Sequence, residues 1–183
     1  MIPEVQPPPP NLDYWLAEPS VRVAHRRESS ASSDQLWQAA LKVRLGDTHL
    51  LGRLVRWRIP DLPDCSFYEL FSQQPFLPLS ESDRSLLSGL VGRIWTLRRD
   101  YPSLANGEQF REWSMQGTAK VLFAHWVEDA ADGRSALRSE TRVEAFGAQG
   151  RVGLATVRPL IAGFQNLVAS DAIAAAVREA ERR

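Results

Sequence analysis

The sequence has very little cysteine and no excess of charge of either sign. Cys65 is the only cysteine among 183 residues, so an internal disulfide is impossible and a reducing compartment is expected. Lysine and arginine together number 22, as do aspartate and glutamate. A neutral chain lacks the electrostatic footprint of proteins that bind nucleic acid or anionic membranes, so neither is an expected partner.

Sequence motifs typical of catalytic, phosphate-binding or metal-binding sites are also missing. His25, His49 and His125 lie far apart and do not have the spacing of metal ligands, so we expect neither a metal nor another cofactor. The chain has no glycine-rich phosphate loop, Gly-x-Ser-x-Gly elbow or His-Glu-x-x-His motif. No secretory segment follows Met1, and polar residues interrupt the longest apolar stretch, so a membrane span is excluded. These absences predict a cytoplasmic protein.

Proline is concentrated at the start of the chain, where Pro7 to Pro10 run together. Residues 1–11 are therefore expected to form a flexible tail of polyproline type. The apolar residues among positions 12–16 would clamp this tail onto a single domain, residues 12–183. Docking of the tail on an aromatic groove of a partner is an alternative.

The next part of the chain predicts one strand and two helices. Apolar and polar residues alternate over Val21–Glu28, which is typical of a strand. Ser32 and Gln35 have the spacing of a capping box and predict a helix with an apolar face over residues 36–41. A second helix is expected over residues 47–59, because a proline follows it.

Strand patterns dominate from residue 67 to residue 146. Phe67–Gln73 and Ser85–Trp95 are rich in aromatic and branched residues and are predicted to be antiparallel partners. Gly89 and Gly92 inside the second run indicate a bulge or a sharp bend. Thr118–Val127 is apolar on both faces, as expected of a strand covered on both sides.

Asp132-Gly133 is the strongest hairpin signal and connects that strand to Arg134–Phe146. Along this last strand the residues alternate between charged side chains and small or apolar ones. We interpret the charged row as a solvated outer face and the other row as facing the terminal helix. A shift of one residue would exchange the two faces. The charged row is Arg138, Glu140, Arg142 and Glu144.

The stretch from Gln149 to Arg183 has apolar residues at steps of three and four, which predicts one long amphipathic helix. At 1.5 Å per residue it would span roughly 50 Å. Pro159 and Gly163 lead us to expect a bend in its middle. The element order predicts an α+β fold, in which a curved antiparallel β-sheet wraps around a long C-terminal α-helix.

This order resembles the helix-grip fold of the START-like, or SRPBCC, superfamily, the polyketide cyclase/dehydrase and lipid-transport group. Leu86 to Trp95, LLSGLVGRIW, is similar to the strand that bacterial members write as GLVGRFW. Ser139 to Val143, SETRV, resembles their TETRV strand, and a proline-containing terminal helix follows. The resemblance runs from about Val21 to the C-terminus. It implies an interior between sheet and helix that is an apolar cavity in some members and filled core in others.

The alternation of side chains along the strands and the periodicity of the helix indicate which residues would line such a cavity. They are Leu90, Arg93, Trp95, Phe123, His125 and Phe164. The aromatic ones could equally fill the core. His125, on an apolar strand face, could be a satisfied core histidine, and Arg93 could extend to the rim.

Three functions fit these residues. In the first, the cavity binds a hydrophobic small molecule such as a lipid, a sterol or a polyketide-like compound. In the second, a cyclase or dehydratase uses His125 with Glu140 or Arg93 as its catalytic group. In the third, the core is filled and the protein acts through its surface or tail. The resemblance to this superfamily, more than the residues themselves, favours binding over catalysis.

Overall fold

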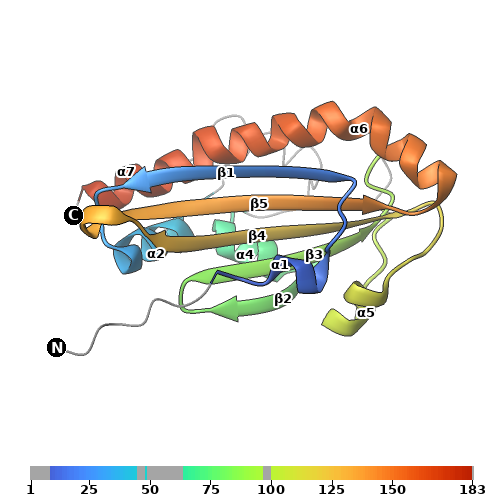
Figure 1. The fold of residues 1–183 in the computed structure, drawn as a ribbon, viewed down its shortest axis with the longest axis horizontal. Coiled ribbons are helices and arrows are strands. Elements are labelled where there is room, and N and C mark those ends of the chain that lie inside the picture. Colours follow the sequence, from blue (N-terminus) through green and yellow to red (C-terminus); the bar gives the residue numbers. More distant parts are fainter. Residues whose placement is uncertain (1–8, 45–47, 49–63, 97–99, 183) are drawn as a thin grey trace.

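One antiparallel sheet organises the structure, a computed structural model that describes residues 9–44, 48, 64–96 and 100–182, without the side chains of residues 164, 165, 167 and 169 (Figure 1). The helix predicted over residues 47–59 lies outside the described residues, except for residue 48. The strands are β1 (Val21–Ser29), β2 (Leu77–Ser82), β3 (Ser85–Gly92), β4 (Ala119–Asp129) and β5 (Ser135–Ala145). Their order in the sheet is β1-β5-β4-β3-β2.

The described helical segments lie around this sheet. They are α1 (Leu12–Trp15), α2 (Ser33–Lys42), α4 (Phe67–Ser72), α5 (Gly107–Glu112), α6 (Gly147–Leu167), the π-helical segment η3 (Val168–Ile173) and α7 (Ala174–Glu181). A short turn, η2 (Ala131–Gly133), closes the β4–β5 hairpin, with Asp132 and Gly133 at positive φ as the sequence predicts. In the part of the chain that is described, no helix is long and apolar enough to cross a membrane.

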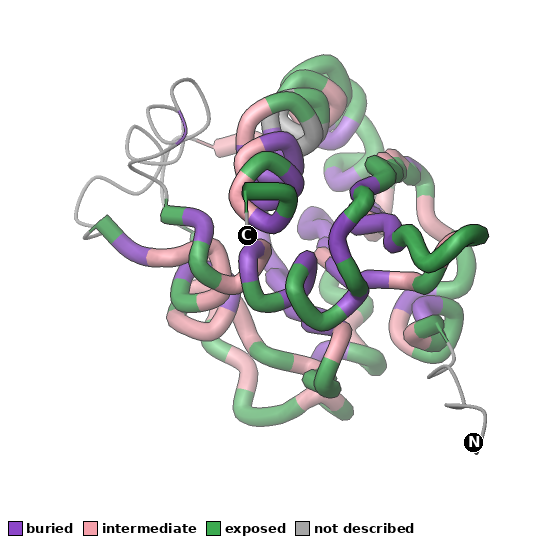
Figure 2. Tube along the Cα trace, turned by 90° about the vertical axis from the view of Figure 1, so that its left-hand side faces the viewer, coloured by how far each residue is buried: buried purple, intermediate pink, exposed green. Residues whose placement is uncertain are grey.

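The C-terminal helix, formed by α6, η3 and α7 in succession, is one continuous helical stretch that runs along the sheet (Figure 1). Its buried residues gather on the side that faces the sheet (Figure 2). The structure therefore has the predicted α+β helix-grip fold. The helix continues with α geometry through Pro159 and Gly163, and it departs from that geometry later, at η3.

One strand prediction is wrong. Phe67–Gln73 was expected to pair with Ser85–Trp95, but residues 67–72 form α4, and β3 pairs instead with β2. The reason is a capping box. Ser66 accepts a hydrogen bond from the Glu69 amide, and the Glu69 carboxylate accepts one from the Ser66 amide. This local signal outweighs the strand propensity of the aromatic residues.

The glycines of β3 have different roles. The β3–β4 register is continuous through Gly89, and the irregularity of this region lies in β2, between Pro78 and Ser80. Gly89 is required because a Cβ there would lie 2.5 Å from Cδ2 of Phe110. At Gly92, φ is +136° and the strand ends, so this glycine terminates the strand that was predicted to continue to Trp95.

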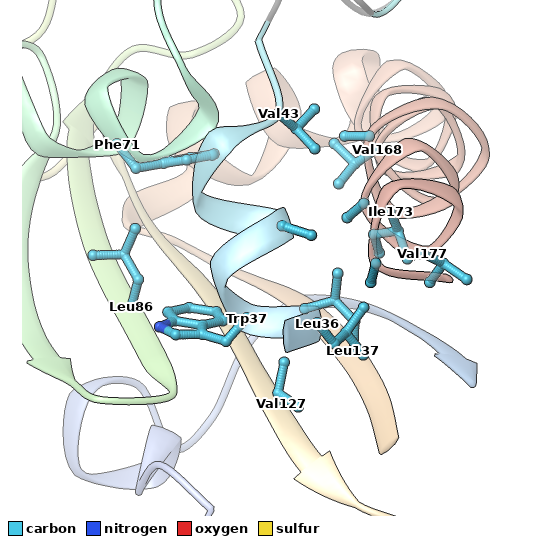
Figure 3. Packing of buried hydrophobic residues seen from close by; sticks show 14 of the residues in the cluster. Leu36, Trp37, Val43, Phe71, Leu86, Val127, Leu137, Val168, Ile173 and Val177 are labelled. Atoms are coloured by element: carbon cyan, nitrogen blue, oxygen red, sulfur yellow. The ribbon is translucent and has the colours of Figure 1, made fainter. Parts of the chain in front are cut away.

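Both faces of the sheet are covered. On the inner face, Val168, Ile173 and Val177 of the C-terminal helix pack toward α2 and the strands (Figure 3). On the outer face, Leu12 and Leu16 pack in a second cluster with residues of β3, β4 and α5. The expected clamp at residues 12–16 therefore forms.

This outer cover makes the prediction of a solvated charged row on β5 wrong for two residues. Glu140 and Arg142 lie on the outer face, as expected, but only 4% and 6% of their surfaces are exposed. Arg142 donates to Glu140 at 2.6 Å, to Asp13 at 2.5 Å and to the carbonyl of Leu16 at 2.7 Å. The segment around α1 therefore lies over the row, and the charges are buried as a paired network rather than solvated.

Candidate functional site

A small cavity lies between the inner face of the sheet and the helices. Its volume is about 30 Å³, about the space of one water molecule. The sheet contributes Leu86, His125 and Leu137, and the surrounding helical segments contribute Trp37, Ala40, Leu41, Val43, Phe67, Tyr68, Ala172, Ile173 and Ala176. His125 is the one titratable group in this lining apart from the phenol of Tyr68. The cavity is therefore an apolar space with an imidazole in its wall.

His125 is held there by strand pairing and by aromatic packing. Its ring contacts Phe67 at 4.9 Å and Phe71 at 5.0 Å between centroids. Burial lowers the pKa of His125 to about 3, because the charged imidazolium cannot be solvated there. The ring is therefore neutral at physiological pH. Its Nε2 atom is buried and has no hydrogen-bond partner among the described residues.

Two neighbouring polar groups share this condition. In the register of the sheet, His125 on β4 lies opposite Ser139 on β5, and Ser139 lies opposite His25 on β1. The three side chains therefore form one row across three strands on the inner face, which we call the polar row. The hydroxyl of Ser139 and Nε2 of His25 are also buried without a partner among the described residues. Buried polar groups in native proteins are nearly always paired, so three in one row require an explanation.

The wall facing the strands contains a break in helix geometry. Ala172 and Ile173 line the cavity and belong to η3, the π-helical segment between α6 and α7. π-helical turns within α-helices occur frequently at functional sites. Here the turn presents one small and one branched apolar side chain, so these two lining residues offer no side-chain hydrogen bond to the polar row.

The predicted site residues do not form one group. His125 lines the cavity, and Phe123 lies beside it, with its ring 5.1 Å from that of Phe71. Leu90 and Trp95 belong to a separate inner cluster near the start of α6, where Trp95 packs against Gly153. The backbone of Phe164 lies in α6, but its side chain is not among those described.

Arg93 lies outside this interior. It follows the end of β3, is exposed and forms an ion pair with Asp100 at 3.5 Å. Glu140 is on the opposite face of the sheet from His125, bound to Arg22 and Arg142. The structure therefore does not bring either proposed partner to His125, and the catalytic constellation expected from the sequence is not assembled.

Sequence reasoning missed His25 and Ser139. The parity of β5 placed Ser139 inward, but its alignment with His25 depends on pairing between residues more than a hundred positions apart. No metal-binding group of three or more His, Cys, Asp or Glu side chains is found within the described ranges.

Comparison with protein-family models finds no match, and comparison with curated proteins finds no significant one. Among solved structures, the chain is similar to a hypothetical protein from Helicobacter pylori, with 9% identity, a TM-score of 0.42, and coverage of 92% of this chain and 93% of that one. It is also similar to the Zhui aromatase/cyclase from Streptomyces sp. R1128, with 14% identity, a TM-score of 0.34, and coverage of 89% and 94%. CalU16 from Micromonospora echinospora matches with 13% identity, a TM-score of 0.29, and coverage of 88% and 83%. Because these TM-scores lie below 0.5, the function has to be argued from the residues of this chain.

Proposed function

We propose that the protein binds an apolar small molecule between the inner face of the sheet and the C-terminal helix. The observation that supports this most directly is the unpaired Nε2 of His125 in an aromatic and aliphatic wall. Leaving a buried polar group unpaired costs about 1–3 kcal/mol. A ligand that pairs with His125 would remove that cost while burying its own apolar surface.

Binding requires the cavity to widen. Pockets for drug-sized ligands have volumes of roughly 300–1,000 Å³, whereas the cavity described here holds about 30 Å³. The ligand would therefore enter by moving η3 away from the strand and helix side chains that form the rest of the cavity lining. We expect slow association, since the open form is a minor state.

Proton abstraction by His125 is the less favoured function. A general base works best when its pKa lies near the operating pH, and burial lowers that of His125 to about 3. No carboxylate or arginine among the described residues hydrogen-bonds to its Nε2. The neutral ring is suited to donating or accepting one hydrogen bond, which is a binding role.

The test is native mass spectrometry of the purified protein, followed by thermal shift with a library of lipids, sterols and aromatic compounds. We expect a co-purifying apolar molecule, or a melting temperature that rises with ligand concentration. Trp37 lines the cavity, so binding should also change its fluorescence. The variant Trp37→Phe should lose that fluorescence change and keep the thermal shift. An empty protein that no compound stabilises would contradict the proposal and favour a filled core.

A further inference from the structure

We infer that the ligand of this interior is an electrically neutral molecule whose oxygen atoms hydrogen-bond to the polar row, His125, Ser139 and His25. This inference rests on the proposed function and adds the chemical class of the ligand and two binding residues.

The register places the three groups at regular intervals. Each is paired with the next across one strand spacing, about 4.8 Å, so the row extends roughly 10 Å from β4 to β1. Ser139 is 1% exposed and His125 is 6% exposed. A ligand that meets all three would lie across the strands, with hydroxyl or carbonyl oxygens along one edge.

The inner face offers no counter-charge to an ionised ligand. Among the described residues of the strands, the charged side chains with inward parity are Arg27, Glu81 and Asp129, each exposed near the end of its strand, β1, β2 or β4. Between them the inward residues of β3, β4 and β5 are apolar or carry neutral polar groups. The low pKa of His125 keeps its ring neutral too. Burying an unpaired carboxylate against such a wall is far more costly than burying a hydroxyl.

The small size of the described cavity raises one competing explanation, which is that trapped water pairs with the row. Water and ligand predict opposite effects of removing the Ser139 hydroxyl. If water satisfies the hydroxyl, Ser139→Ala loses a hydrogen bond and destabilises the ligand-free protein. If the hydroxyl is unpaired until a ligand arrives, the same variant stabilises the ligand-free protein and weakens binding.

The experiment uses two matched pairs of probes, 2-naphthol with 2-naphthoate and dodecanol with dodecanoate, at pH 7. Dissociation constants come from tryptophan fluorescence and from calorimetry. We expect the neutral member of at least one pair to bind at least tenfold more tightly than its anion. Ser139→Ala should weaken binding of that neutral probe about fivefold, the effect of one hydrogen bond, and raise the melting temperature of the ligand-free protein.

Ser85→Ala is the matched control, because Ser85 lies on the outer face of β3 and its hydroxyl is paired with that of Ser82. It should leave probe affinity unchanged. Equal affinity for neutral and anionic probes, or a Ser139→Ala variant that binds as the wild type does, would overturn the inference while leaving the proposed function intact. If neither probe pair nor the apolar library binds, the proposed function fails together with the inference.

Discussion

At the scale of single residues, His125 is the informative side chain. It lies on β4 between two phenylalanine rings, and its Nε2 has no partner among the described residues. A histidine in this state is stable only as the neutral ring, so the fold depends on pH through a group that makes no ion pair. Ser139, next to it in the polar row, has no charge to lose and lacks this dependence.

The pH dependence can be tested directly. Burial lowers the pKa of His125 from 6.5 to about 3. Between these two pH values His125 is therefore protonated in the unfolded chain but neutral in the folded protein. The free energy of unfolding should therefore fall as the pH drops from 6.5 toward 3, by about 1.4 kcal/mol per pH unit from this group. The variant His125→Phe should show a shallower curve in urea titrations across that range. Parallel curves for the two proteins would contradict this account, since the other titrating groups are common to both.

How much of the site can be predicted depends on how far apart its residues lie in the sequence. The parity of a single strand places His125 on the inner face with Val121 and Phe123, and the structure agrees. His25 cannot be joined to it in this way, because that requires the β1–β5 pairing. Arg93 was assigned inward by counting alternate residues past Gly92, where β3 ends and alternation stops.

At the scale of elements, the short segment from Asn11 to Leu16 carries more weight than its length indicates. Arg142 anchors it through Asp13 and the Leu16 carbonyl, and this hydrogen bond to Arg142 lowers the pKa of Asp13. The same guanidinium is paired with the buried Glu140. The sequence predicted the clamp from its apolar residues, but alternating charge on β5 could not reveal that another segment covers it.

Substitution of Arg142 tests this anchor. Arg142→Met leaves the buried Glu140 carboxylate with Arg22 alone and removes the hydrogen bond to Leu16. We expect a loss of about 3 kcal/mol in the free energy of unfolding, the cost of breaking a buried pair. Arg138→Met is the control, because Arg138 is on the same strand face and its ion pair with Glu128 is partly exposed. Similar small losses for both variants would show that the anchor is unimportant.

Two glycines of α6 provide a second test at this scale. A Cβ at Gly153 would overlap the indole of Trp95, whereas a Cβ at Gly163 would meet nothing within 4 Å. Alanine favours a helix over glycine by about 1 kcal/mol, but overpacking costs about 1–3 kcal/mol. Gly163→Ala should therefore raise the midpoint of urea denaturation, and Gly153→Ala should lower it. A higher midpoint for both variants would mean that the indole of Trp95 moves aside without a loss of stability.

At the scale of the whole molecule, the sheet is a middle layer with apolar clusters on both sides. Period and turn signals predicted the strands β1, β3, β4 and β5 and the terminal helix, because each signal lies within one element. They failed at α4, where a capping box and strand-forming residues gave conflicting signals. They also gave no sign of which face of the sheet the N-terminal segment covers.

The contribution of this outer layer is measurable by truncation. Deleting residues 2–16 removes Leu12 and Leu16 from the outer cluster and uncovers Leu122 and Val91. At about 1.5–3 kcal/mol for each buried leucine, we expect a loss of at least about 3 kcal/mol in stability and increased binding of an apolar dye. Deleting residues 2–10 keeps Asn11–Leu16 and should change neither quantity. Equal behaviour of the two truncated chains would contradict a stabilising role for the segment.

The position of the C-terminal helix has a consequence for synthesis of the protein. The inner cluster joins Val21 of β1 and Val143 of β5 to Leu154 of α6, so the strands emerge from the ribosome before the residues that cover them. Until α6 and α7 are released, the nascent chain presents an uncovered apolar sheet face, which is aggregation-prone. Completion of the fold therefore has to wait until α6 and α7 have emerged from the ribosome. A chain stalled at residue 146 should bind chaperones that the full-length protein no longer engages.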